Sequence, residues 1–195
     1  LLTEPQSTNL ITNSNDFSNS YWTKAGSSVV GGFTSPDGSG NAFKLVESVL
    51  NESHFVYSST ITVTNGAYST VSVILKYSGV QWIAFNTQFG ASNVRGWFDV
   101  KNGVLGTQEA GLTADIELLS DGWYRCSNTY LNDGTTSRSR FYLSPSDNDN
   151  NAYQGDGTSG AYIFGAQLEE LSYATSYIPT YGAVRTRLQD SVNGA

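Results

Sequence analysis

Apolar and polar residues alternate with a period of two along most of this chain. The clearest case is the stretch 80–100, VQWIAFNTQFGASNVRGWFDV, which reads as two strands joined by a glycine-containing turn. The alternation predicts that the core takes Ile83, Phe85, Phe98 and Val100. The opposite face then carries flat rings and hydrogen-bonding groups, namely Trp82, Asn86, Gln88, Arg95, Trp97 and Asp99.

The same period predicts further strands, which fall in the stretches 41–48, 55–64, 67–79, 115–118, 123–131, 137–145 and 161–171. We expect 123–131 and 137–145 to pair across the Asn132-Asp133-Gly134 turn. No segment of ten or more residues has a helical stripe of apolar residues. The pattern therefore predicts an all-β fold, a jelly roll in which two antiparallel sheets pack face to face.

Length and composition fit one domain over residues 1–195. The chain has 195 residues, 13% of them aromatic and 14% charged, which is enough apolar material for one sizeable core. No apolar run reaches about eighteen residues, so we expect no contact with a membrane. The sequence lacks Met, which suggests a processed product or a module excised from a larger protein. Its acidic surface, rich in Asn, Ser, Thr and Gly, suggests a secreted or extracellular protein.

Several kinds of chemistry are disfavoured. The net charge of -7 argues against nucleic acid as a partner. With one Cys and one His the chain has no internal disulfide and no usual zinc site, and His54 is expected at the surface or at a sheet edge. A GxSxG nucleophile motif and a phosphate-binding glycine loop are both missing from the sequence. Asp115 and Glu117 share a strand face, which is weak support for a glycosidase. We expect no catalysis and no required cofactor.

The outward positions favour sugar binding. The C–H faces of pyranose rings lie on aromatic rings, and sugar hydroxyls need amide or charged partners at the edges. Trp82, Trp97 and Tyr142 would provide the rings, and Asn86 and Gln88 the amides. The alternation also turns five cations outward: Lys76, Arg95, Arg125, Arg138 and Arg140.

The guanidinium group matches carboxylates and sulfates, so the predicted ligand is an acidic polysaccharide, a uronate or sulfated polymer such as those of marine algae. Lys76 would join the face of Trp82 if their strands were neighbours in one sheet. The competing interpretation is that the arginines pair across strands with Asp99, Asp115 or Glu117.

Three segments carry a resemblance to a known family: TEPQSTNLITNSNDFSNSYWTKAG at the start, DGWYRCS in the centre, and DGTSGAYIFGAQLEELSYATSYIPTYGAVRTR at the end. Together they resemble a carbohydrate-binding-module-like jelly-roll domain found in secreted polysaccharide-degrading enzymes and in phage tail proteins. The resemblance implies a non-catalytic domain attached to a parent catalytic domain, often with a structural calcium ion. It also implies that six residues are framework, namely Trp22, Asp99, Trp123, Arg125, Gln167 and Glu169.

Three hypotheses follow from the sequence. The first is a monomeric carbohydrate-binding module that anchors a parent enzyme to a polysaccharide. The second is a structural or receptor-binding domain of a phage tail fibre, and the third is a small jelly-roll polysaccharide lyase. The acidic loop 144–160 is the place where calcium could bind, although its spacing does not match a helix-loop-helix calcium site.

Overall fold

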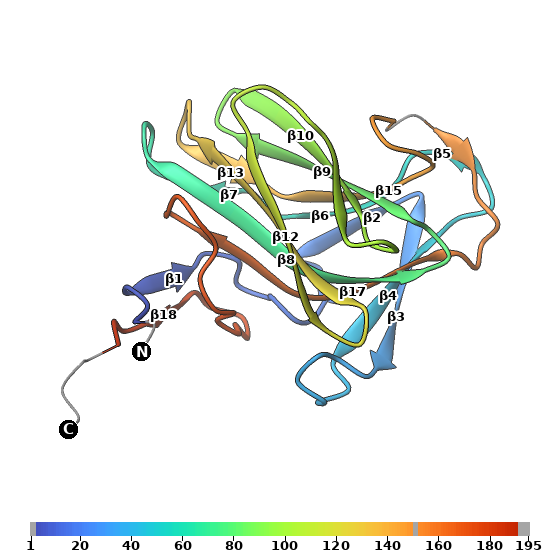
Figure 1. Ribbon diagram of the computed structural model, residues 1–195, viewed down its shortest axis with the longest axis horizontal. Coiled ribbons are helices and arrows are strands. Elements are labelled where there is room, and N and C mark those ends of the chain that lie inside the picture. Colours follow the sequence, from blue (N-terminus) through green and yellow to red (C-terminus); the bar gives the residue numbers. More distant parts are fainter. Residues whose placement is uncertain (1–2, 150–151, 191–195) are drawn as a thin grey trace.

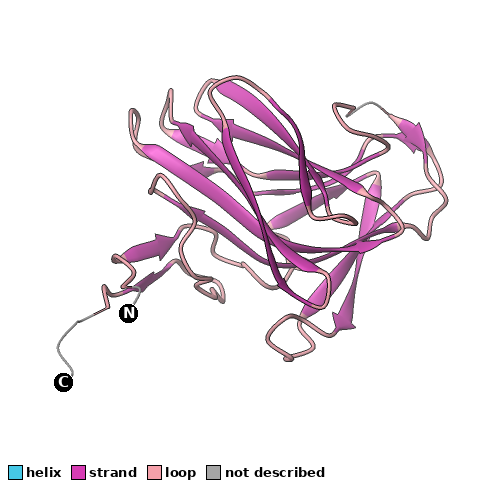
Figure 2. Ribbon diagram, in the orientation of Figure 1, coloured by secondary structure: helices cyan, strands magenta, loops and turns pink. Residues whose placement is uncertain are grey.

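The computed structural model describes residues 3–149 and 152–190 and shows a β-sandwich (Figure 1). These ranges contain strands, turns and loops, with no helix among them (Figure 2). A helix capable of crossing a membrane is accordingly not found in them. The predicted all-β fold of two antiparallel sheets is confirmed.

The larger sheet has eight strands and the smaller has six, and every pairing is antiparallel. The eight-stranded sheet contains β2 (Trp22–Ala25), β6 (His54–Ser58), β7 (Ile61–Thr62), β9 (Trp82–Phe89), β10 (Ser92–Asp99), β11 (Val104–Gln108), β14 (Thr136–Arg138) and β15 (Arg140–Ser144). The six-stranded sheet contains β3 (Ser27–Phe33), β4 (Ala42–Glu47), β8 (Tyr68–Ser78), β12 (Thr113–Ser120), β13 (Trp123–Leu131) and β17 (Gly160–Glu169). Two short ribbons complete the fold, β1 (Ser7–Asn9) with β18 (Arg185–Arg187) and β5 (Asn51–Glu52) with β16 (Tyr153–Gln154).

The chain passes repeatedly between the two sheets. The main path of the larger sheet runs β11-β10-β9-β15-β6-β2, and the smaller runs β12-β13-β8-β17-β4-β3. The stretches 123–131 and 137–145 therefore do not form the predicted hairpin, because β13 belongs to one sheet and β14 and β15 belong to the other. The segment 132–134 instead carries the chain from the six-stranded sheet to the eight-stranded sheet.

The core lies between the two sheets. Ile83, Phe85, Phe98 and Val100 are each no more than 1% exposed, as the alternation predicted. Burying each of these side chains stabilises the fold by roughly 2 kcal/mol. The inward side chains of these strands thus pack in the core, and only their outward side chains can take other roles.

A bulge in β17 changes which residues of that strand face the core. The register slips between Phe164 and Gln167, and Gly165 lies there at a φ of +62°, where a side chain is disfavoured. Before the bulge, Phe164 joins Ile74 and Trp123 in a small cluster separate from the main core. After it, Ala166 and Leu168 belong to the main core. The predicted burial of Phe164, Ala166 and Leu168 is confirmed, but on two different sides of the sheet.

The polar residues after the bulge hold both ends of the chain. The backbone N–H of Ile178 donates to Gln167 Oε1 at 2.7 Å, and that of Thr175 donates to Glu169 Oε2 at 3.0 Å. The hydroxyl of Ser7 donates to the same Glu169 carboxylate, which is fully buried. The C-terminal tail and the N-terminal arm are therefore fixed to the outer face of the six-stranded sheet.

We expect Gln167→Leu to lower the free energy of unfolding by about 2 kcal/mol, because the buried N–H of Ile178 would lose its acceptor. Chemical denaturation measures this loss. The same substitution at the exposed Gln6 is the control and should cost less than about 0.5 kcal/mol. Equal stability of the two variants would contradict the tethering role of Gln167.

Candidate functional site

The outer face of the eight-stranded sheet gathers most of the predicted ligand-binding residues. Arg95 lies opposite Asn86 in the register of β10 and β9, and Asp99 lies opposite Trp82. Tyr142 of β15 lies opposite Ala84 of β9, so it shares this face. The period-two assignment of Trp82, Asn86, Gln88, Arg95, Trp97, Arg138, Arg140 and Tyr142 to one surface agrees with the observed register.

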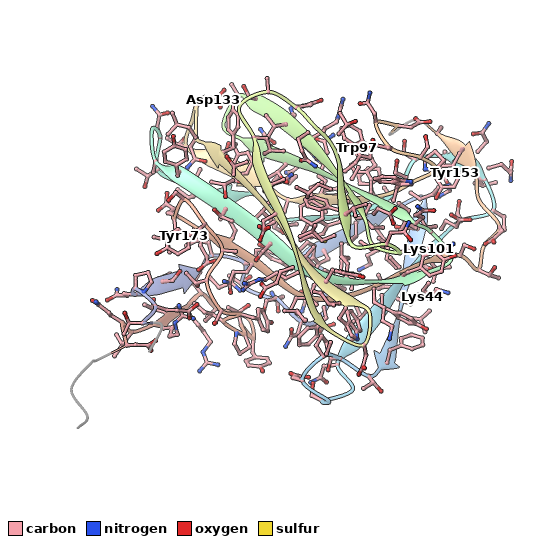
Figure 3. The ribbon with its side chains drawn as sticks, in the orientation of Figure 1. Lys44, Trp97, Lys101, Asp133, Tyr153 and Tyr173 are labelled. Carbon is pink, nitrogen blue, oxygen red and sulfur yellow. The ribbon has the colours of Figure 1, made fainter. Side chains whose placement is uncertain are left out.

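Trp97 lies on this face but offers no ring to a ligand. Its side chain, labelled in Figure 3, is only 2% exposed, and its indole N–H donates to the carbonyl of Asp149 at 3.0 Å. The loop that holds Asp149 is fixed to β11 because the N–H of Thr107 donates to Asp147 at 2.8 Å. The expectation that Trp97 is an exposed stacking ring is therefore wrong: a loop covers it.

Trp82 is partly exposed but is closely packed at the edge of this face. A side-chain carbon added at Gly106 of β11 would lie 2.5 Å from the Trp82 ring, so the ring fills the space that this glycine leaves. The predicted pair of exposed indoles does not exist as such, because one ring is covered and the other packs against a neighbouring strand.

Asp99 acts as the centre of the turn after β10. Its carboxylate accepts hydrogen bonds from Gln81 at 2.7 Å, from the Asn102 side chain at 2.8 Å, and from the N–H groups of Lys101 and Asn102. Burial alone would raise the pKa of Asp99, but these hydrogen bonds outweigh it and bring the pKa below its ordinary value. Asp99 is framework, as the resemblance implied, and is not a partner for the arginines.

Lys76 and Arg125 do not belong to this face. Both lie on the six-stranded sheet, Lys76 in β8 and Arg125 in β13. Arg125 pairs with Glu117 at 2.6 Å across strands and donates to the carbonyl of Thr175 at 2.9 Å. The expectation that they join one binding surface is wrong, and for Arg125 the competing cross-strand pairing is what the structure shows.

Three arginines remain together on the face, and we call Arg95, Arg138 and Arg140 the arginine cluster. Arg140 donates to Asn93 Oδ1 at 2.6 Å, and Arg138 donates to the Thr60 hydroxyl at 2.7 Å. Burial lowers the pKa of Arg140, and the neighbouring Arg138 and Arg95 charges lower it further, against the opposing effect of two tyrosines. The guanidinium groups of Arg138 and Arg95 thus both lie within electrostatic reach of that of Arg140.

The arginine cluster carries little compensating negative charge. Within residues 3–149 and 152–190, the carboxylate that forms an ion pair with it is Glu109, whose oxygen lies 3.8 Å from Arg95. Both side chains of that pair are 38% exposed, so water and salt screen it. One carboxylate against three guanidiniums leaves a local positive charge on a protein whose net charge is -7.

A row of aromatic rings lies beside the arginine cluster. Tyr142 stacks on Phe55 of β6 at 4.2 Å with a 12° angle between the rings, and Phe55 stacks on Tyr57 at 5.7 Å. The Arg138 guanidinium lies over the Tyr57 ring at 5.4 Å. Sequence reasoning missed Phe55 and Tyr57, although the F-V-Y alternation, with buried Val56 between them, was a signal that both face outward.

Some polar atoms of this face have no partner among the described residues. Asn86 Oδ1, Arg95 Nε and Arg138 Nε are buried and make no hydrogen bond there. A buried polar atom without a partner costs about 1–3 kcal/mol, so these atoms favour a bound water or a ligand group. They lie on the face that also carries the rings and the charge.

His54 and the acidic loop do not form a second chemical site. His54 is fully buried, and its Nδ1 and Nε2 lie 2.6 and 3.0 Å from the carbonyls of Gly26 and Tyr153, so the expectation of a surface histidine is wrong. In the described part of the loop, Asp147 binds Thr107 and Asp156 binds Ser159. No group of three acidic, His or Cys side chains converges within the described ranges, and Asn150 and Asn151 lie outside them. The calcium ion implied by the resemblance stays a prediction.

Comparisons with known proteins add little to this description. No protein-family model matches the chain, and no curated protein matches it. Among solved structures, the chain is similar to the Clostridium thermocellum N-terminal endo-1,4-beta-D-xylanase 10B, CBM22-1-GH10 modules, complexed with xylohexaose. The TM-score is 0.41 and the identity 11%, over 88% of this chain and 29% of that chain. These values are too low to transfer a ligand or an activity.

We expect Trp97→Phe to lower the free energy of unfolding by about 1 kcal/mol, because the hydrogen bond to Asp149 is lost. Retention of the protein by any polysaccharide gel should stay at the wild-type level, since the covered ring touches no ligand. Chemical denaturation and affinity electrophoresis measure the two effects. Weakened retention with unchanged stability would show instead that the Trp97 ring binds the ligand.

Proposed function

We propose that this chain is a non-catalytic carbohydrate-binding module whose ligand is an acidic polysaccharide lying across the outer face of the eight-stranded sheet. The observation that carries the proposal is the arginine cluster, three guanidinium groups beside a row of rings, of which Arg95 alone pairs with a carboxylate among the described residues. Neutralisation of an isolated cluster of this kind is favourable when a ligand brings its own anions.

The chemistry of the face matches the two parts of an acidic sugar. Each guanidinium can donate two parallel hydrogen bonds to a carboxylate or a sulfate. The ring row supplies apolar surface for the C–H groups of the sugar. Gln88 is partly exposed and donates its NH2 group to the carbonyl of Gly90 at 2.9 Å, so it offers its amide oxygen to a hydroxyl, whereas Asn86 is only 7% exposed. Rigid strands hold these groups, so little ordering is needed when the ligand binds.

The single histidine supports a binding role over a catalytic one. Both nitrogens of His54 face backbone carbonyls inside the protein, away from the arginine cluster. A module of this kind would function through attachment to a secreted catalytic domain, because tethering raises the effective concentration of substrate even when single-site affinity is weak. Secretion and the parent domain are part of the proposal.

The charge of the arginine cluster can be tested by affinity electrophoresis through gels that contain alginate, carrageenan or neutral glucan. We expect retardation by a charged polymer, and we expect Arg138→Gln with Arg140→Gln to weaken binding about a hundredfold, since each of the two lost charge-assisted contacts is worth about 1.5 kcal/mol. Raising the salt to 1 M, where the Debye length is about 3 Å, should also weaken the retention of the wild-type protein by the charged gel.

The matched control is the double variant Lys76→Gln with Lys101→Gln, which removes the same charge from outside the cluster. It should be retained almost like the wild type. Equal losses in both double variants would mean that net charge alone decides retention. If no gel retards the protein, the hypothesis of a phage tail fibre domain is favoured. If the protein shortens the polymer, the hypothesis of a polysaccharide lyase is favoured.

The ring row makes a separate contribution that salt does not screen. Tyr142→Leu should weaken retention about three- to tenfold at both low and high salt, because a ring contact is worth about 0.5–1.5 kcal/mol beyond its area. The exposed Tyr173 of the tail, changed to Leu, is the control. A loss for Tyr142→Leu that disappears in 1 M salt would show that the ring only positions Arg140.

A further inference from the structure

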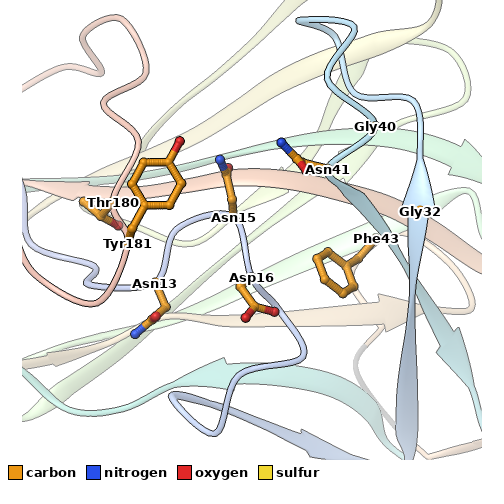
Figure 4. Close-up of a pocket in the computed structure, with 9 residues that line it drawn as sticks. All are labelled: Asn13, Asn15, Asp16, Gly32, Gly40, Asn41, Phe43, Thr180 and Tyr181. Carbon is orange, nitrogen blue, oxygen red and sulfur yellow. The ribbon is translucent and has the colours of Figure 1, made fainter.

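A cavity whose lining differs in chemistry from the arginine cluster lies elsewhere on the sandwich. It has a volume of about 410 Å³ and is open to solvent (Figure 4). Its residues come from the N-terminal arm, from the hairpin of β3 and β4, and from the tail after Ile178. We call it the amide pocket, and its lining includes Asn15, Asp16, Asn41, Phe43, Thr180 and Tyr181. The volume falls at the lower end of the range of small-ligand sites, about 300–1,000 Å³.

The polar side chains of the amide pocket offer both donors and acceptors. Asn15 Oδ1 accepts from the Tyr177 hydroxyl at 2.5 Å, which leaves its NH2 group as a donor. Asn41 uses its NH2 group on the Ser39 hydroxyl at 3.0 Å, which leaves its oxygen as an acceptor. Asp16 uses Oδ1 for two hydrogen bonds from Ser18, and its other oxygen makes none within the described residues.

An aromatic ring lies on either side of these groups. Phe43 is partly buried, and its ring packs edge-on against the buried Phe17 at 6.1 Å, so its position is fixed. Tyr181 is 71% exposed and stands on the tail. Side-chain carbons added at Gly32 and Gly40 would meet no atom within 4 Å, so the walls at these two positions are open.

Hydrogen bonds from the arm to β2 and to the tail hold the pocket in shape. The indole N–H of Trp22 donates to the carbonyl of Asn13 at 2.7 Å. Thr180 accepts from the N–H of Ser14 at 3.0 Å and donates to the carbonyl of Ile11 at 2.6 Å. A pocket held in this way is preorganised, so the protein loses less conformational entropy when a ligand binds.

We propose that the amide pocket binds one neutral pyranose residue, such as the uncharged end of a glycan. Sugar hydroxyls both donate and accept, which the mixed set of amide and carboxylate groups satisfies, and the C–H face of the ring can lie on Tyr181 or Phe43. The described lining contains no Lys or Arg, and its one charged group is the Asp16 carboxylate, so an anionic sugar is disfavoured. The site is therefore separate in chemistry and in place from the arginine cluster.

Titration of the isotope-labelled protein by NMR tests this, with the methyl glycosides of glucose, galactose, mannose, xylose, fucose and rhamnose as probes. We expect at least one glycoside to shift the backbone signals of residues around Asn15 and Asn41 in a saturable way. Tyr181→Ala and Asn41→Ala should each raise the dissociation constant at least fivefold. Both residues are exposed, so the melting temperature should not change.

Matched controls separate this site from the arginine cluster. Tyr173→Ala and Asn51→Ala change exposed residues of the same types elsewhere and should bind the glycoside like the wild type. The Arg138→Gln with Arg140→Gln variant should also bind it normally, and 1 M salt should have no effect. Absence of saturable binding by all six glycosides, or binding that survives both pocket substitutions, would overturn the proposal.

Discussion

The arrangement of the arm and the tail on this protein depends on the hydrogen bonds of two buried side chains, Gln167 and Glu169. They stand on the outer side of β17 after its bulge and hold the backbone of the tail at Thr175 and Ile178, and Ser7 of the N-terminal arm. A buried carboxylate is tolerated only with such partners, so the tail cannot leave without a large cost. The N-terminal arm and the tail after β17 therefore lie against the six-stranded sheet.

Because the arm and the tail lie against the six-stranded sheet, the two candidate sites differ. The arginine cluster stands on the rigid strands β10, β14 and β15, where register fixes the spacing of the groups and a long polymer can lie across them. The amide pocket is built where arm, hairpin and tail meet, and its volume of about 410 Å³ suits a single small group. A module with both would combine charge recognition along a polysaccharide with recognition of a single neutral residue.

Some of the face was predictable from local pattern. Alternation placed Asn86, Gln88, Arg95 and Tyr142 on one surface because neighbouring side chains of a strand point to opposite sides whatever the strand pairs with. The same rule would have turned Phe55 and Tyr57 outward, opposite to the buried Val56. It could not have said that the strand carrying them lies next to β15, because that pairing joins residues far apart in the sequence.

The sequence by itself determined the all-β class, the inward set of apolar residues and the outward direction of the polar ones, since all three depend on a backbone period of two. Only the tertiary structure decided which strands share a sheet, and so separated Lys76 and Arg125 from the arginine cluster. It also decided that a loop covers Trp97 and that arm, hairpin and tail enclose a pocket. These features come from contacts between distant segments, and alternation along one strand carries no information about what will lie on top of it.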